Sequence, residues 1–143
     1  MKHRCLMIGV GGMGARWVRD IWSPFGDRLE IAAVVDVDPV ALQAAADWIG
    51  LSPAARFTDP REAFATVDAD FCCIVTPPAY HQEAVELACA RGLPILSEKP
   101  IADTWEGCEA IVRAVRAAGV KMMITQNYRS TARILTLKEA IAT

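Results

Sequence analysis

Residues 9–14 read Gly-Val-Gly-Gly-Met-Gly, and this stretch decides how the rest of the chain is interpreted. The apolar residues before it, at 5–8, predict a buried strand, and the residues after it predict a helix. Gly9 permits a tight turn out of the strand, and Gly11 lets the backbone approach a pyrophosphate because it has no Cβ. Gly14 allows the helix to lie close to the strand, and the helix N-terminus offers free N–H groups to phosphate oxygens. The stretch therefore predicts a dinucleotide-binding turn.

A second predicted strand, at 29–35, ends at Asp36, which follows Gly14 by about the 20 residues expected of a ribose-binding acid. A carboxylate at this place accepts hydrogen bonds from the adenosine ribose and repels a 2′-phosphate. Val37 stands where a phosphate site favours Arg or Ser, so NAD is predicted over NADP. Arg16 is the nearby cation that could alter this preference. The alternative interpretation of Asp36 is a solvated carboxylate at a strand end.

The composition indicates one compact α/β domain. Of the 143 residues, 53% are hydrophobic and 22% are charged, which is enough for one sizeable core. The net charge of −2, without a basic run, argues against nucleic acid as a partner. No apolar stretch approaches the roughly 18 residues of a membrane span, and no signal-peptide segment precedes the first strand. We therefore expect a cytoplasmic protein without a membrane partner.

The five cysteines predict buried, reduced thiols rather than disulfides or a metal site. Their number is odd and none forms a Cys-x-x-Cys pair: they are Cys5, Cys72, Cys73, Cys89 and Cys108. Most stand in apolar patterns, where cysteine behaves as a small hydrophobic residue. A zinc site needs clustered ligands, and only His3 and His81 could add to these thiols, so no metal site is predicted.

Strand-like and helix-like segments alternate along the chain. Apolar runs predict strands at 5–8, 29–35, 55–57, 71–75, 93–96 and 120–124. Helices are predicted between them. The longest follows an N-cap at Asp103 or Thr104 and ends at Gly119, with a buried face of Cys108, Ile111, Val112, Val115 and Ala118. This alternation predicts a doubly wound parallel sheet, the Rossmann arrangement, with about six strands in the order 3-2-1-4-5-6.

Ligands of an open parallel sheet bind beyond the carboxyl ends of its strands. Polar residues stand there after three more strands: Thr76-Pro77-Pro78 with His81, Glu98-Lys99-Pro100, and Gln126-Asn127-Tyr128-Arg129. A lysine amine such as that of Lys99 can give or take a proton beside an alcohol or a carbonyl, although a strand-end lysine is also often just a solvated cation. His81 is alternatively a helix-cap or surface histidine. A cis bond between Lys99 and Pro100 is possible.

The glycine turn, Thr76-Pro77-Pro78 with His81, and Glu98-Lys99-Pro100 together resemble the Gfo/Idh/MocA family of NAD(P)-dependent oxidoreductases. The resemblance implies an N-terminal cofactor domain whose enzymes commonly act on sugars, cyclitols or related polyols. It implies that Lys99 takes part in catalysis near the nicotinamide. It also implies a set of cofactor-binding residues: Gly9, Gly11, Gly12, Met13 and Gly14 at the pyrophosphate, Asp36 at the ribose, Thr76, Pro77 and His81 lining the cleft, and Glu98 beside the nicotinamide ribose.

Residues 127–143 are interpreted as the start of a connection. The family resemblance implies a C-terminal substrate domain, outside this chain, that supplies further active-site residues and most oligomer contacts. We therefore expect residues 1–126 to form the dinucleotide-binding domain and a homo-oligomer to be one possible assembly. The predicted function is NAD-dependent hydride transfer to or from a polyol. The alternatives are an NAD-binding or redox-sensing module without turnover, and an inactive truncation product.

Overall fold

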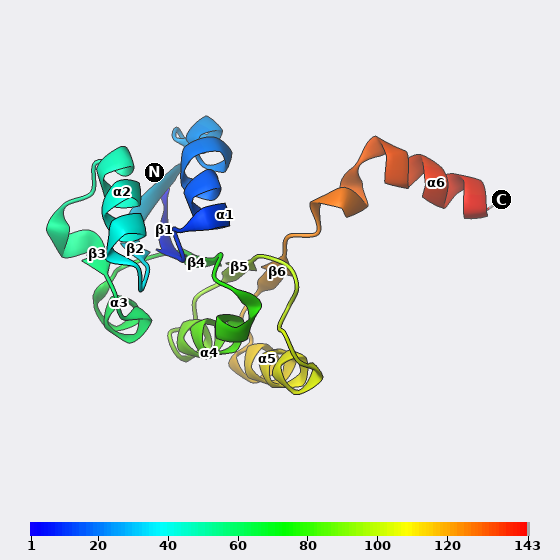
Figure 1. The fold of residues 1–143 in the computed structure, drawn as a ribbon. Helices are drawn as coiled ribbons and strands as arrows, with labels where there is room; N and C mark the ends of the chain where they lie inside the picture. Colours follow the sequence, from blue (N-terminus) through cyan, green and yellow to red (C-terminus); the bar gives the residue numbers. More distant parts are fainter. Residues whose placement is uncertain (143) are drawn as a thin grey trace.

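The computed structural model describes residues 1–142, so Thr143, the last residue of the predicted connection, lies outside the described residues. Six parallel strands form one sheet in the order β3-β2-β1-β4-β5-β6, which confirms the predicted fold class (Figure 1). The strands are β1 (His3–Ile8), β2 (Leu29–Val35), β3 (Arg56–Phe57), β4 (Phe71–Ile74), β5 (Ile95–Ser97) and β6 (Met122–Ile124).

Helices cover both faces of this sheet. The covering helices are α1 (Gly12–Arg16), α2 (Pro39–Ile49), α3 (Pro60–Thr66), α4 (His81–Ala90) and α5 (Trp105–Ala118), and a further helix, α6 (Ala132–Ala142), follows β6. Figure 1 shows α1 and α2 on one face and α3, α4 and α5 on the other. Two parallel strands cannot be joined by a tight hairpin and need a crossover connection, which usually contains a helix. The helices between the strands are these crossovers, and they pack above and below the sheet.

The helix after the glycine turn changes its geometry part-way along. At Trp17 it passes from α1 into a wider π-helical turn, η1 (Trp17–Ile21), in which the Trp22 N–H donates to the Trp17 carbonyl at 2.9 Å. Both indoles are consequently buried on the same face, with ring centroids 5.9 Å apart. The apolar spacing predicted the helix but not this turn.

Side chains of the central strands alternate between two cores. Leu6 and Ile8 of β1 pack with α3, α4 and α5, whereas Cys5 and Met7 pack with η1 and α2. Because both faces are covered, β1 and β4 are the nearly continuous apolar runs that parallel sheets favour. Burial raises the pKa of the Cys72 thiol on β4 to about 12, as expected for an unreactive core cysteine. All five cysteines are free, three buried and two half-buried.

The buried face predicted for α5 is partly wrong. Ile111 is fully buried, but Val112 and Ala118 are exposed. This helix packs chiefly on α4, through a stripe at three- and four-residue spacing that includes Cys108, Ile111 and Val115. The two exposed residues stand beside that stripe. Thr104, not Asp103, is the N-cap, since its hydroxyl accepts from the Gly107 N–H at 3.0 Å.

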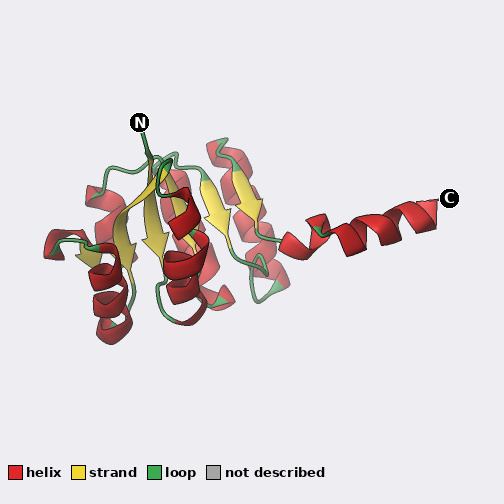
Figure 2. Ribbon diagram, turned by 90° about the horizontal axis from the view of Figure 1, so that it is seen from above, coloured by secondary structure: helices red, strands yellow, loops and turns green. Residues whose placement is uncertain are grey.

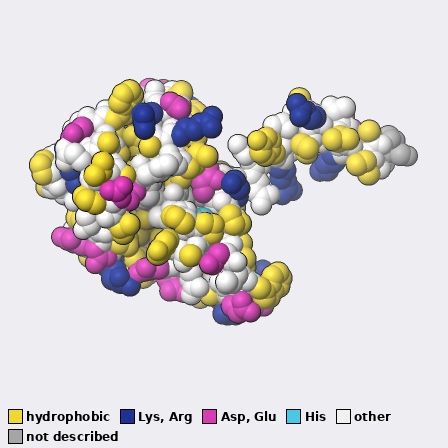
Figure 3. Space-filling model, in the orientation of Figure 1, with side chains coloured by type: hydrophobic (Ala, Val, Ile, Leu, Met, Phe, Trp, Pro, Cys, Tyr) yellow, Lys and Arg dark blue, Asp and Glu magenta, His cyan; other side chains and the backbone are white. Residues whose placement is uncertain are grey.

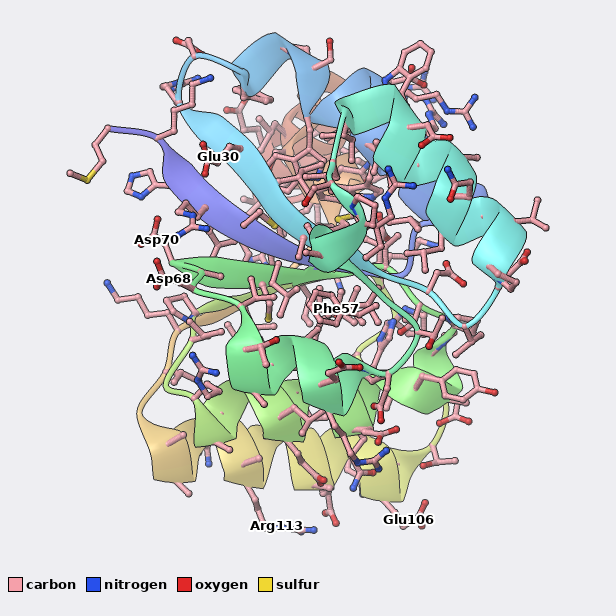
Figure 4. All side chains as sticks on the ribbon, turned by 90° about the vertical axis from the view of Figure 1, so that its left-hand side faces the viewer. Glu30, Phe57, Asp68, Asp70, Glu106 and Arg113 are labelled. Carbon is pink, nitrogen blue, oxygen red and sulfur yellow. The ribbon has the colours of Figure 1, made fainter. Side chains whose placement is uncertain are left out.

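Charged residues at the amino ends of the strands form a separate cluster around Arg4. Its guanidinium lies 3.2 Å from Glu30 and 2.5 Å from Asp68, and its backbone N–H donates to Asp70 at 2.7 Å. Figure 4 shows the labelled side chains of Glu30, Asp68 and Asp70 near one another at this end of the sheet. These pairs are exposed, where ion pairs stabilise a fold by little. The cluster joins β1 to β2 and to the loop before β4, at the edge opposite the candidate site.

The chain beyond β6 leaves the sheet. A 3-10 turn, η5 (Asn127–Ser130), leads into α6, which projects away from the three layers formed by the sheet and its covering helices (Figures 1 and 2). No residue of α6 is buried. Its exposed hydrophobic side chains, seen in yellow along the projecting helix in Figure 3, are Ile134, Leu135, Leu137 and Ile141.

Candidate functional site

A cleft of about 750 Å³ opens where β1, β2 and β4 end. This volume lies within the range of small-molecule and cofactor sites. Seven of the predicted site residues line it: Gly9, Gly11, Gly12, Met13, Asp36, Thr76 and Pro77. Gly14, His81, Glu98 and Lys99 do not belong to its lining. The structure therefore separates the predicted set into cleft residues and residues behind or beside the cleft.

The glycine turn is built as its sequence predicts. Gly9 has a φ of 86°, and a Cβ at this residue would lie 2.8 Å from the Val75 backbone carbonyl. A Cβ at Gly14 would collide with the Gly9 carbonyl oxygen, so only glycine allows the helix to approach the strand this closely. Gly14 thus acts through packing, from behind the cleft.

Gly12 and Met13 open the first turn of α1 and face the cleft. A Cβ at Gly12 would meet nothing within 4 Å, so the backbone there is accessible from the cleft. The N–H groups of a first helical turn have no acceptor within the helix. Together with the positive end of the helix dipole, they form a ready site for an anion such as a phosphate.

Asp36 ties the end of β2 to the glycine turn. Its Oδ2 accepts from the N–H groups of Val10 and Gly11, each at 2.8 Å, and its Oδ1 accepts from the Asp38 N–H at 3.0 Å. The interpretation of Asp36 as a merely solvated carboxylate is therefore wrong. An ionised carboxylate accepts about four hydrogen bonds, so roughly one position stays open for a ribose hydroxyl.

The end of the cleft beyond Asp36 is acidic. Asp59 and Glu83 also line it, and the guanidinium of Arg61 contacts both carboxylates. Arg16, the cation that could have altered the cofactor preference, pairs with Asp20 at 3.9 Å and does not line the cleft. Arg16 and Arg61 are thus already paired with carboxylates, so neither is free to bind an additional phosphate group on a ligand at this end of the cleft.

Thr76 lines the cleft, but its hydroxyl oxygen is buried within the wall. Within the described residues, its buried Oγ1 has no hydrogen-bond partner, although most buried hydroxyls have one. Its backbone carbonyl lies 2.9 Å from Nε2 of His81. Thr76 therefore contributes its surface to the cleft, while its main chain is held from behind by His81.

The expectation that His81 lines the cleft is wrong. Its ring is fully buried at the start of α4, and Nδ1 lies 3.0 Å from the carbonyl of Pro100 and 3.3 Å from that of Ile101. Because both ring nitrogens face backbone carbonyls, the ring joins the Thr76 loop to the Pro100 loop. It is neither a helix cap nor a surface histidine, and it supports the cleft wall from behind.

Glu98 and Lys99 follow β5, beside the cleft. Oε1 of Glu98 accepts from the indole Nε1 of Trp17 at 3.0 Å, and its Oε2 accepts from the Lys99 N–H at 3.1 Å. The Lys99–Pro100 bond is cis, as the sequence allowed, and the Lys99 side chain is exposed. Residues 126–129 are exposed beyond β6 and do not line the cleft.

Sequence reasoning missed part of the cleft wall. Thr58, Asp59, Pro60 and Arg61 follow β3, and Tyr80 and Glu83 lie at the start of α4. In the sequence, the Asp59-Pro60 pair indicates only the start of a helix, and the structure confirms Asp59 as the N-cap of α3. The rule that ligands bind at the carboxyl ends of strands applies to the short third strand too, and it could have found this segment.

Residues 1–142 contain neither a metal-ligand cluster nor a membrane-spanning helix. No group of three or more His, Cys, Asp or Glu side chains in that range could hold a metal ion. None of the helices described there combines the length and the apolar character that crossing a bilayer requires.

Comparison with known proteins identifies the family. The model of the GFO_IDH_MocA family, described as an oxidoreductase family with an NAD-binding Rossmann fold, matches residues 3–126. The chain is 44% identical to the uncharacterized protein y4oX of Sinorhizobium fredii, covering 99% of this chain and 41% of that protein. It is 37% identical to an inositol 2-dehydrogenase of an Arthrobacter species, covering 82% of this chain and 34% of that protein.

A solved structure agrees with these matches. The WlbA dehydrogenase of Bordetella pertussis, in complex with NADH and UDP-GlcNAcA, is similar at a TM-score of 0.89 and 30% identity, covering 99% of this chain and 42% of that chain. The chain thus spans less than half the length of each of these three proteins. On these matches, and on the cleft at its glycine turn, the chain belongs to the Gfo/Idh/MocA oxidoreductases and carries their NAD-binding Rossmann domain.

Proposed function

We propose that the protein is the cofactor domain of an enzyme that transfers a hydride between NAD and a sugar, a cyclitol or a related polyol. The observation that carries this proposal is the cleft at the carboxyl edge of the sheet, where Asp36 holds the glycine turn. Support for the substrate class comes from relatives named as inositol 2-dehydrogenases and from a neighbour solved with a UDP-sugar.

The residues of the cleft fit the cofactor. The N–H groups of Gly12 and Met13 would hold the pyrophosphate, and the remaining acceptor position of Asp36 would bind the adenosine ribose. Thr76 and Pro77 would lie against the cofactor along the cleft wall. The acidic end beyond Asp36 favours NAD over NADP, because a 2′-phosphate there would meet carboxylates. Glu98 would lie beside the nicotinamide ribose.

Lys99 would handle the proton of the reaction. When bound, NAD supplies a hydride acceptor, so oxidation of a carbinol carbon breaks its C–H bond and forms a carbonyl. The hydroxyl proton must leave in the same process, and the exposed amine of Lys99 would take it and would return it in reduction. Reaction in either direction also requires the substrate to be held and shielded from water.

We further propose that residues 127–143 begin the connection to a substrate-binding domain. The family match stops at residue 126, and α6 projects from the sheet without a buried residue. A cytoplasmic location is proposed as well, since all five cysteines are free, as is common in reducing compartments.

Cofactor binding can be tested on this chain directly. Titration with NADH and NADPH, followed by quenching of the fluorescence of its four tryptophans, should give at least about tenfold tighter binding of NADH. Equal or reversed affinities would contradict the role of the acidic end. Undetectable binding of both would contradict the proposed cofactor domain.

The proposed role of Lys99 in proton transfer must be tested in a form of the protein that shows NAD-linked turnover. There, Lys99→Met should lower kcat by about 10²–10⁴-fold while leaving the NADH Kd nearly unchanged. Lys121→Met is the matched control, because it removes the same charge from an exposed lysine at the amino edge of β6. Unchanged kcat in Lys99→Met would remove Lys99 from the mechanism. Binding of NADH without turnover in any form would favour the non-catalytic module.

A further inference from the structure

The turn that carries Lys99 is anchored to the helix that begins at the glycine turn. The carboxylate of Glu98 bridges two donors, the indole of Trp17 at 3.0 Å and the backbone N–H of Lys99 at 3.1 Å. We propose that Trp17 is a positioning residue for Lys99 that acts through Glu98, an inference that rests on the proposed role of Lys99.

Trp17 is itself rigidly held. Its side chain is only 6% exposed, and it packs on Trp22, whose ring in turn lies 5.8 Å from Phe71 of β4. An indole has a single hydrogen-bond donor, and here that donor serves Glu98. A bond from a fixed donor to a charged acceptor is directional and comparatively strong, so it restricts where the carboxylate can lie.

The other end of the same turn is held independently. Nδ1 of His81 faces the carbonyls of Pro100 and Ile101, while its Nε2 faces the Thr76 carbonyl. The main chain on both sides of Lys99 is therefore fixed, although its side chain is exposed. The anchors differ in their partners, since His81 connects the turn to the β4 loop and Trp17 connects it to the glycine-turn helix.

This second connection has a consequence for the reaction. Trp17 stands about one helical turn beyond Gly12 and Met13, whose N–H groups are proposed to hold the pyrophosphate. One continuous helical segment thus contacts the cofactor at its N-terminus and the lysine turn through Trp17, across 81 residues of sequence. The distance between cofactor and amine depends on this segment, and proton and hydride transfer are sensitive to small changes in such distances.

The chain offers a matched control in Trp22. This residue is 8% exposed and belongs to the same core cluster, but within the described residues its Nε1 has no hydrogen-bond partner. Trp17→Phe and Trp22→Phe therefore remove the same atoms from the same cluster, and only Trp17→Phe removes a hydrogen bond. Any effect of packing alone should be similar in both variants.

The first experiment measures amide hydrogen exchange of this chain by NMR, with stability recorded by denaturant unfolding for each variant. The Lys99 N–H should exchange about tenfold faster in Trp17→Phe than in Trp22→Phe, after correction for stability, because its acceptor is no longer held. In a Glu98→Ala background, adding Trp17→Phe should change this exchange no further. Equal exchange in the two Phe variants, or full additivity with Glu98→Ala, would overturn the proposal.

The second experiment uses a form of the protein that turns over. Trp17→Phe should lower kcat about tenfold without changing the NADH Kd, and Trp22→Phe should leave kcat nearly unchanged. Normal kcat in Trp17→Phe together with a large loss of kcat in Lys99→Met would overturn only the positioning role of Trp17. Normal kcat in Lys99→Met would overturn the proposed role of Lys99, and the positioning role of Trp17 with it.

Discussion

Replacing Asp36 by Asn should weaken the fold and cofactor binding together. The carboxylate accepts from Val10 and Gly11 at 2.8 Å and from Asp38 at 3.0 Å. Asparagine keeps one carbonyl oxygen, which can still accept from both N–H groups of the glycine turn. Its NH₂ group would then face the N–H of Asp38, and the negative charge that strengthens all three bonds would be gone.

The size of the effect follows from these bonds. A hydrogen bond to a charged group contributes about 1.5–3 kcal/mol, against about 1 kcal/mol for a neutral one, and Asp36 is only half-buried. Asp36→Asn should therefore cost about 2 kcal/mol of stability, which lowers the Tm of a domain of this size by about 4–8 °C. NADH affinity should fall about tenfold, because the turn is less fixed and the ribose acceptor is weaker.

NADPH should still bind weakly to this variant. Removal of one carboxylate leaves Asp59 and Glu83 in the cleft and frees no cation, since Arg61 remains in contact with both of them. Removal of the negative charge at Asp36 is thus not sufficient to change the preference for NADH over NADPH.

Thermal unfolding followed by circular dichroism, with NADH and NADPH titrations, measures all three effects. Asp38→Asn is the control, because it removes the same charge two residues away while Asn caps a helix about as well as Asp. Its Tm and NADH affinity should stay near the wild-type values. A wild-type Tm in Asp36→Asn would show that this carboxylate does not hold the turn, and tight NADPH binding would refute the charge argument.

Three further outcomes are expected. Gly14→Ala should cost about 3 kcal/mol in denaturant unfolding, because its Cβ meets the Gly9 backbone. Gly26→Ala should cost little, because Gly26 has an ordinary φ and its Cβ would lie at a van der Waals distance of 3.6 Å from the Ser23 carbonyl oxygen; equal losses in the two variants would contradict this reason. Burial raises the pKa values of the thiols of Cys5, Cys72 and Cys73, so these thiols stay neutral in the folded chain while the unfolded chain ionises near pH 9. The free energy of unfolding should then fall as the pH rises above about 9, by up to about 1.4 kcal/mol per pH unit for each thiol. A urea midpoint that does not change between pH 8 and pH 10 would contradict this loss of stability. The exposed apolar side chains of α6 should cause concentration-dependent association in sedimentation velocity, which Leu137→Glu reduces; a monomer at all concentrations would speak against this surface.

The fold could be predicted because its signals are local. The apolar runs of β1 and β4 identify strands covered on both faces, and short connections between strands leave few arrangements for the sheet. Strand ends were predicted less well, since 93–96 became Ile95–Ser97 and 120–124 became Met122–Ile124. These ends depend on partners, because Ile95 pairs with both Cys72 and Met122, and a strand extends only as far as its neighbours do.

The sequence by itself determined the parts of the site that depend on one residue and its neighbours in the chain. Gly9 and Gly14 are required by backbone conformation and close approach, and an acid after the second strand can reach the turn that follows the first. Only the tertiary structure decided which atoms meet behind the cleft. His81 reaches carbonyls about 20 residues away and Trp17 reaches Glu98 across 81 residues, and no periodicity encodes such contacts. They arise because parallel strands bring distant loops to one edge, where buried donors and acceptors must find partners among whatever the fold places within hydrogen-bonding distance.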